Sequence, residues 1–367
     1  MIKPTHQWET RSHRAVRTEE RPFADDPRSE AFVLHCVNGR EGWAHVGLER
    51  QQVDARSRHD ASLIHAICAW LVARGKRHIA LRDENDRIVA ESPINLTGLS
   101  NLPQGPCKRI ITICPSNVEM VWALGCFDRV IACEDSSDFP PEVESLERLG
   151  PDLGPNLDRI AELEPDLVIS SLTVPGMERN VTGLRARGVP QLVLAPRSLD
   201  DVLAELQTLG RILEVPYRAA AVIDDMRKQI ATLEREALSL GEPARVYLEW
   251  WPRPMFSPGS DCYSNELIML AGGVNVFGER PGSSLQIEAE ELLAANPEVC
   301  FVSWCGVAAD KLDIQRLIGR PGLEQLSAAR KGAVYPLDEQ FSGRPGPRML
   351  EAARIMAAGI RAARQLD

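Results

Sequence analysis

Aromatic and polar side chains follow three of the predicted strands in the C-terminal half of the chain, at the point where each strand ends. The runs are Glu249-Trp250-Trp251, Trp304-Cys305 and Asp338 to Phe341. Tryptophan is large and seldom fully buried. Because the carboxyl ends of parallel strands meet at one edge of a sheet, these rings are predicted to share one surface. Such a surface suits stacking on a large, flat, partly apolar ligand.

Acid–base and metal chemistry lack their usual residues in this half. All seven histidines lie at or before His78, without the spacing of a metal site. A chelatase-like enzyme would need a histidine or a carboxylate–histidine pair. Ser116 has no base beside it, and Cys305 has no histidine partner in its own half. We therefore expect binding without catalysis, with no catalytic or metal site. A chelatase-like enzyme, and Cys305 as a soft metal ligand, stay open as alternatives.

Composition narrows the classes of partner. The chain has 367 residues, 44% of them hydrophobic, and a net charge of −10 without a basic stripe, so a small-molecule ligand is favoured over nucleic acid. Nine cysteines without a C-x-x-C pair indicate free thiols in a reducing compartment. No apolar h-region opens the chain and no run is long enough to span a membrane, so we expect a cytoplasmic monomer.

One long helix is predicted over Pro216–Leu238. Proline occupies the first helical position, and apolar residues recur three or four apart. A helix of this length would extend roughly 35 Å. Strands alternating with helices precede and follow it, which predicts a mostly parallel sheet on each side. The fold class is therefore α/β, with two doubly wound αβ lobes joined by one rigid helix.

The chain is divided by composition into five parts. We expect a disordered tail, a small β-β-α-β-β (α+β) module, an N-terminal lobe, connecting helices and a C-terminal lobe. Their ranges are 1–29, 30–106, 107–197, 198–240 and 241–367. In the N-terminal lobe, the loops that follow strands place Ser116 and Asn117, Asp138 and Phe139, and Thr173 at the ligand edge.

Residues 108–366 resemble the cobalamin- and siderophore-binding proteins that serve ABC importers. The resemblance rests on RIITICPSNVEMVWALG, DFPPEVESLERLG, PNLDRIAELEPDLVI, the long helix, SNELIMLAGGVNVF and EELLAANPEVCFVSW. The runs EWWPRPMF and SWCG are most similar to a cobalamin-binding subgroup without export signals. The resemblance implies the class III substrate-binding fold, in which two lobes enclose a cleft.

What the resemblance implies about function is specific. The ligand would be a cobalamin or related corrinoid, with no obligatory cofactor, bound between Asp138 and Phe139 of one lobe and Trp250, Trp304 and Phe341 of the other. Iron-siderophore or haem binding for uptake, or ligand sensing by an interaction protein, are the alternatives. Exported relatives are periplasmic and dock an ABC permease through one acidic residue on each lobe. The matching positions are Asp158 and Glu290.

Overall fold

The computed structural model describes residues 100–365 except Gln104, together with short strands and three helical residues before them. It divides the chain into two compact units. Unit 1 comprises residues 1–114, 131–135 and 147–195, and unit 2 comprises 115–130, 136–146 and 196–367. Segments 115–130 and 136–146, which the sequence assigns to the N-terminal lobe, thus belong to unit 2.

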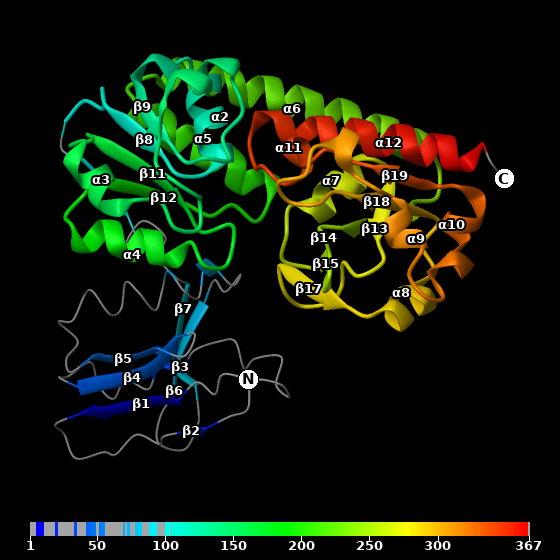
Figure 1. The fold of residues 1–367 in the computed structure, drawn as a ribbon, viewed down its shortest axis with the longest axis horizontal. Helices are drawn as coiled ribbons and strands as arrows, with labels where there is room; N and C mark the ends of the chain where they lie inside the picture. Colours follow the sequence, from blue (N-terminus) through cyan, green and yellow to red (C-terminus); the bar gives the residue numbers. More distant parts are fainter. Residues whose placement is uncertain are drawn as a thin grey trace. The chain divides into compact units, whose positions relative to one another are not determined.

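Unit 1 is built on a five-stranded sheet in the order β10-β9-β8-β11-β12 (Figure 1). Strand β11 pairs in parallel with β8 and β12, and β9 pairs in parallel with β10. These strands are β8 (Ile110–Thr112), β9 (Val130–Cys133), β10 (Glu147–Arg148), β11 (Leu167–Ser171) and β12 (Gln191–Leu194). Every residue of β8, β11 and β12 is buried, as expected for a parallel sheet covered on both faces.

Two helices accompany this sheet, α3 (Leu157–Glu162) and α4 (Glu178–Ala186). Asn156 caps α3, because its side-chain oxygen accepts the Arg159 backbone N–H at 3.0 Å. Ile160 of α3 and Leu184 of α4 pack with Ile111 of β8 and Val168 of β11 in one apolar core. Burial of these aliphatic side chains fixes the sheet.

Residues 100 and 101 extend the sheet at its edge. Asn101 forms an antiparallel bridge with Gln191 of β12, with both backbone hydrogen bonds at 2.8 Å. The Ser100 hydroxyl accepts the Val193 N–H at 3.1 Å. Residues 100 and 101 therefore satisfy backbone groups that would otherwise leave the edge strand open.

Unit 2 holds a second parallel sheet, in the order β16-β13-β18-β19, and a small antiparallel sheet, in the order β14-β15-β17. The parallel strands are β13 (Ala244–Glu249), β16 (Gly273–Asn275), β18 (Val299–Val302) and β19 (Val334–Pro336). The antiparallel strands are β14 (Trp251–Pro252), β15 (Met255–Pro258) and β17 (Ser284–Ile287). The two parallel sheets confirm the predicted α/β class, whereas the antiparallel sheet was not predicted.

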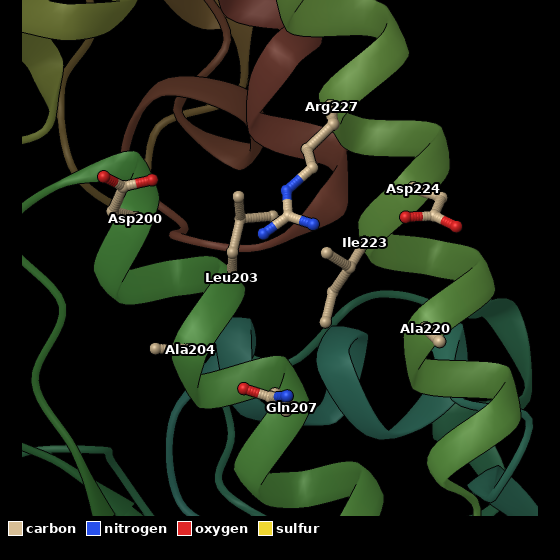
Figure 2. Close-up of a pocket in the computed structure, with 8 residues that line it drawn as sticks. All are labelled: Asp200, Leu203, Ala204, Gln207, Ala220, Ile223, Asp224 and Arg227. Atoms are coloured by element: carbon tan, nitrogen blue, oxygen red, sulfur yellow. The ribbon is translucent and has the colours of Figure 1, made fainter.

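The predicted long helix is present as α6 (Pro216–Ser239), with Pro216 at its start. It packs on α5 (Leu199–Ile212), where a Cβ on Gly210 would lie 2.3 Å from Ala219 Cβ, so glycine permits the close crossing. A groove of about 310 Å³ lies between these helices. Figure 2 shows Arg227 extending from α6 toward Leu203 of α5. Helix α12 (Leu350–Arg364) runs beside α6 (Figure 1).

Short helices complete unit 2. The α-helices are α2 (Pro115–Ala123), α7 (Ser264–Leu270), α8 (Ala289–Ala295), α9 (Gln315–Ile318), α10 (Ser327–Lys331) and α11 (Glu339–Ser342). The 3₁₀ turns are η2 (Phe127–Arg129), η3 (Pro141–Ser145), η4 (Ala309–Lys311), η5 (Leu323–Gln325) and η6 (Pro347–Met349). Within residues 100–365, no helix combines the length and the apolar character needed to cross a bilayer.

The front part of the chain is described only as strands and three helical residues. Strands β1 (Thr5–Thr10) and β2 (Glu19–Glu20) fall in the predicted tail, and they join β4 (Gly42–Leu48) and β5 (Gln51–Ala55) in one sheet. Strands β6 (His78–Arg82) and β7 (Ile88–Pro93) pair antiparallel, next to β3 (Val33–Leu34). In the part of the predicted β-β-α-β-β module between β5 and β6, residues 69 and 72–73 are helical, and the other residues of this stretch lie outside the described ones.

Candidate functional site

Arg344 is the centre of a charged cluster in unit 2, and its side chain is only 8% exposed. Its guanidinium lies 3.1 Å from Glu119 Oε1, 3.2 Å from Asp138 Oδ2 and 3.4 Å from Glu339 Oε2. Glu119 is on α2, Asp138 is in segment 136–146, and Glu339 begins α11. One buried cation thus joins three segments that are far apart in sequence. We call these four residues the Arg344 cluster.

Three partly exposed rings lie beside this cluster. The Arg348 guanidinium stacks 3.8 Å from the centroid of the Phe139 ring and 5.1 Å from that of Phe341. Trp122 meets Phe139 edge to face, with ring centroids 4.9 Å apart. Phe139 and Phe341 are half-buried, and Trp122 is 43% exposed. Trp122, Phe139 and Phe341 form what we call the aromatic platform, a surface suited to stacking on an apolar ligand.

Local sequence explains how the platform is held. Helix α2 begins at Pro115, so Glu119 falls beyond its first turn, and its side chain is buried. The Asp138 and Phe139 backbone precedes η3, whose Val143 is fully buried and anchors the segment. Asp338 caps α11, since its carboxylate accepts the Gln340 N–H at 3.1 Å. Arg348 also donates a hydrogen bond to the Gln340 side chain.

Burial and pairing shift the pKa values of this cluster in different directions. Burial raises the pKa of Glu119 to about 7, although Arg348 and Arg344 oppose the shift. Burial likewise raises the pKa of Glu339. For Asp138, burial is outweighed by the hydrogen bond and charge of Arg344, so its pKa lies below the ordinary value. The Asp138 carboxylate is therefore the ionised partner of Arg344 across the whole neutral range.

A second buried cluster surrounds Glu249, which is 0% exposed. Arg320 donates to both carboxylate oxygens, at 2.5 Å and 3.0 Å. The Trp304 indole N–H donates to the same carboxylate at 3.0 Å, and the Tyr247 hydroxyl at 3.2 Å. Burial and the Glu249 charge raise the pKa of Tyr247 well above its ordinary value. Both carboxylate oxygens of Glu249 thus accept hydrogen bonds from side chains inside unit 2.

This second cluster corrects two sequence-based expectations. Trp304 is 3% exposed, and its ring is covered on one side by the Arg316 guanidinium, 5.8 Å from the ring centroid. The Trp304 ring is therefore not available for stacking, and the Glu249 carboxylate is not available to a ligand. The strand-end position was correct, but the side chains turn into the core.

Other predicted residues of the same region are more exposed. Trp251 in β14 is exposed, as is Cys305. Trp250 is half-buried, and its indole N–H has no hydrogen-bond acceptor among the described residues. The Cys305 backbone N–H donates to the Trp250 carbonyl at 3.3 Å, which keeps these two residues adjacent. These three residues remain predicted ligand contacts.

Predicted residues from the N-terminal half are divided between the units. Ser116 and Asn117 are buried in the first turn of α2, in unit 2. Thr173 belongs to unit 1, where its hydroxyl lies 2.8 Å from that of Ser171. Asp138 and Phe139 belong to unit 2 and contact Arg344 and Arg348 as described above. Among these five residues, Phe139 lies in a partly exposed aromatic surface, and Asp138 pairs with Arg344.

The predicted docking residues lie on the surface of different units. Asp158, in α3 of unit 1, is paired with Arg187 at 2.8 Å. Glu290 is exposed in the first turn of α8 in unit 2. Among the described residues, no three His, Cys, Asp or Glu side chains are grouped closely enough to hold a metal ion.

Sequence reasoning missed Arg344, Arg348, Glu339 and Trp122, and did not give Glu119 a role. A signal was present in the run that follows Phe341, where two arginines alternate with prolines and glycines in SGRPGPR. Rigid residues on both sides restrict the backbone of such a run, and arginine is preferred for paired and stacked sites. Two of the carboxylate partners of Arg344, Glu119 and Asp138, however, lie more than 200 residues earlier in the chain.

Comparisons with known proteins agree with this architecture. Two curated relatives are vitamin B12-binding proteins of Yersinia pestis (strain Pestoides F) and Yersinia pseudotuberculosis (serotype O:1b), each 27% identical over 71% of this chain and 88% of the relative. The solved vitamin B12-binding protein BtuF of Vibrio cholerae is 25% identical, with a TM-score of 0.60 over 71% of this chain and 98% of that protein. The haem-binding protein RhuT of Roseiflexus is also 25% identical, with a TM-score of 0.63 over 71% and 99%.

The family model described as "Periplasmic binding protein" matches residues 110–341. That range includes the parallel sheets of both units, as well as Asp138, Phe139 and Phe341. It confirms the predicted family of substrate-binding proteins and the expectation of a binding protein rather than an enzyme. The chain belongs to the periplasmic binding protein family.

Proposed function

We propose that this chain binds a corrinoid such as cobalamin, and that the aromatic platform of unit 2 contacts it. The observation that carries the proposal is the platform itself: three partly exposed rings, two of them stacked on Arg348, beside a buried ion-pair cluster. Rings fixed before binding lose little conformational entropy when a flat ligand covers them. The curated relatives named as vitamin B12-binding proteins support a corrinoid over other flat ligands.

Haem is the second candidate, because a solved relative at 25% identity is named as haem-binding. Haem iron is commonly held by histidine, cysteine, methionine or tyrosine. All histidines of this chain lie at or before His78, so residues 110–341 would have to supply one of the other three ligands. Both macrocycles bring four ring nitrogens to their metal, but cobalamin also carries its own axial ligands, so it needs no such residue from the protein. This difference favours the corrinoid, with ferric siderophores as a third class.

Titration of the purified full chain with cobalamin, cobinamide, haemin and a ferric hydroxamate, followed by absorption and calorimetry, decides between these ligands. We expect saturable heat with a corrinoid and no change in the ligand's spectrum beyond that of binding. Saturation by haemin or the hydroxamate alone would replace the corrinoid by that ligand.

Substitution of Phe139 by alanine tests the platform. Loss of an aromatic contact at a binding centre costs about 2 kcal/mol or more, so we expect affinity to fall about thirtyfold. Tyr217→Ala is the matched control, because this ring lies on α6, is 90% exposed and does not belong to the platform. Equal affinities of the two variants would exclude the platform as the binding surface.

Delivery to an ABC permease through Asp158 and Glu290 is part of the same proposal. Both carboxylates are exposed, although Asp158 is already paired with Arg187. The expected cytoplasmic location would keep the chain from an external permease, so cell fractionation comes first. Recovery in the periplasm would favour delivery, and recovery in the cytosol would favour ligand storage or sensing.

A further inference from the structure

We propose that Asp138 is a positioning residue for ligand binding: it fixes Phe139 in the platform through its ion pair with Arg344 and does not itself contact the ligand. The inference rests on the proposed function, and it assigns Asp138 a different role from the direct contact that the sequence suggests. Asp138 and Phe139 are adjacent, so the carboxylate and the ring are carried by the same stretch of backbone.

The geometry around Arg344 indicates that this arginine holds Asp138 in place. Both guanidinium nitrogens at the end of Arg344 donate to the two Asp138 oxygens, which is the paired arrangement that fixes orientation as well as distance. Arg344 is itself held by Glu119 at 3.1 Å and Glu339 at 3.4 Å. Arg344 therefore keeps two carboxylate partners when the Asp138 pair is removed. Asp138, whose side chain is largely exposed, depends on Arg344.

The ring side of the segment has its own restraints. Phe139 is bounded by Trp122 at 4.9 Å and by Arg348 at 3.8 Å. Arg348 is paired in turn with Glu119 at 3.1 Å. The carboxylate and the ring are thus attached to one framework in which Glu119 touches both arginines. If the Asp138 pair is broken, this end of the segment loses its ion pair to the framework, while the contacts of the Phe139 ring with Trp122 and Arg348 remain.

A double-mutant cycle separates positioning from direct contact. We expect Asp138→Asn to weaken corrinoid binding about tenfold, and Phe139→Ala to weaken it about thirtyfold. If Asp138 acts through Phe139, Asp138→Asn should cost less than about twofold more in the Phe139→Ala background, because coupled residues are not additive. A full further tenfold loss would show that Asp138 contacts the ligand directly and would overturn the inference. Asp224→Asn, exposed on α6, is the control and should bind as wild type.

Arg344→Lys keeps the charge and removes the paired geometry, so it should bind about as weakly as Asp138→Asn. Replacing Arg344 by an uncharged residue is less informative, because it would leave two buried carboxylates without their cation and endanger folding. Wild-type affinity in Arg344→Lys would contradict the requirement for paired hydrogen bonds.

A ligand-free measurement keeps the inference separate from the proposed function. The Val143 and Leu146 amides are hydrogen-bonded within η3, at 2.9 Å and 3.1 Å. We expect Asp138→Asn to speed hydrogen exchange of segment 136–146 about tenfold, with the rest of unit 2 unchanged. Unchanged exchange in this segment overturns the inference whether or not a ligand binds. Failure of every ligand to bind wild type, with faster exchange in the variant, would reject the proposed function and leave the restraint on Phe139 established.

Discussion

Unit 2 contains the Arg344 cluster and a second cluster of Glu249, Arg320, Trp304 and Tyr247, which we call the Glu249 cluster. Both clusters contain arginine and carboxylate side chains, but one lies beside a partly exposed surface and the other lies in the core. In each, an arginine is paired with a fully buried or nearly buried carboxylate, and aromatic rings lie beside the pair. Around Glu249, the rings of Trp304 and Tyr247 donate hydrogen bonds inward and are buried. Around Arg344, the rings of Trp122, Phe139 and Phe341 keep exposed faces. Ring exposure, and not residue type, distinguishes the candidate binding surface from the core.

The largest expected effect is a loss of stability when a buried ring of the Glu249 cluster is removed. Trp304→Ala should lower the free energy of unfolding by about 3–5 kcal/mol, because it opens a cavity and removes a hydrogen bond to the buried Glu249 carboxylate. Trp122→Ala, the matched change in the platform, should cost less than about 1.5 kcal/mol in stability. Urea unfolding of both ligand-free variants makes the measurement. Equal losses would mean that the two clusters do not differ in the way proposed.

The contrast between these tryptophans shows what sequence reasoning could reach. Strands β8, β11, β13 and β18 were predicted because each is a short β-branched or apolar run, and α6 because its apolar residues recur at helical spacing. Trp304 follows its strand as expected, but whether it faces a ligand or the core depends on Glu249 and Arg320. The last two residues are 71 positions apart, and no local pattern links them.

Sequence reasoning predicted two residues of the aromatic platform but not the arginine beside them, because that arginine pairs with distant residues. Phe139 and Phe341 follow predicted strands, so their loops could be identified from sequence. Arg344 could not be, since its partner Asp138 lies 206 positions earlier and Glu119 lies 225 positions earlier. The antiparallel sheet of β14, β15 and β17 was missed because prolines interrupt the first two strands. Sequence reasoning could predict local conformation, but it could not predict which distant segments pair with each other.

The second prediction concerns the pH dependence of the Arg344 cluster. Burial raises the pKa of Glu119 from 4.5 to about 7, so between these values the folded state keeps a proton that the unfolded state releases. Stability from this group is therefore greatest below pH 4.5 and is lost as the pH rises toward 7. The full shift corresponds to about 3 kcal/mol as an upper bound.

Glu119→Gln removes the titrating group, so its stability should vary less with pH across this window than that of wild type. Thermal unfolding at several pH values between 4 and 8 makes the comparison. Glu234→Gln, exposed on α6, should keep the wild-type slope. A Glu119→Gln slope equal to that of wild type would show that the pKa of Glu119 is not raised in the folded protein.

The third prediction compares two truncations of unit 1. A chain that begins at residue 98 retains the bonds of Ser100 and Asn101 to β12, whereas one that begins at 106 loses three hydrogen bonds at that edge. Each such bond contributes about 0.5–1.5 kcal/mol net, so the shorter chain should be less stable by about 1–3 kcal/mol. Urea midpoints of the two chains test this. If they coincide, residues 100 and 101 do not stabilise the sheet, and the boundary near 106 is the better one.

The smallest expected effect is the loss of stability on substitution of Arg316, which we compare with that on substitution of Arg320. Arg320 is largely buried and donates two hydrogen bonds to Glu249, whereas Arg316 is exposed, 5.8 Å from the Trp304 ring and 3.8 Å from Asp313. An exposed cation–π contact and an exposed ion pair each contribute at most about 1 kcal/mol, so Arg316→Gln should lower stability by less than that amount. Arg320→Gln leaves the buried carboxylate without its cation and should cost about 3–5 kcal/mol. If Arg316→Gln proved as costly as Arg320→Gln, the contact of Arg316 with the Trp304 ring would stabilise the Glu249 cluster as much as the buried ion pair does. Burial of the Arg320–Glu249 pair would then no longer explain why this cluster contributes to stability.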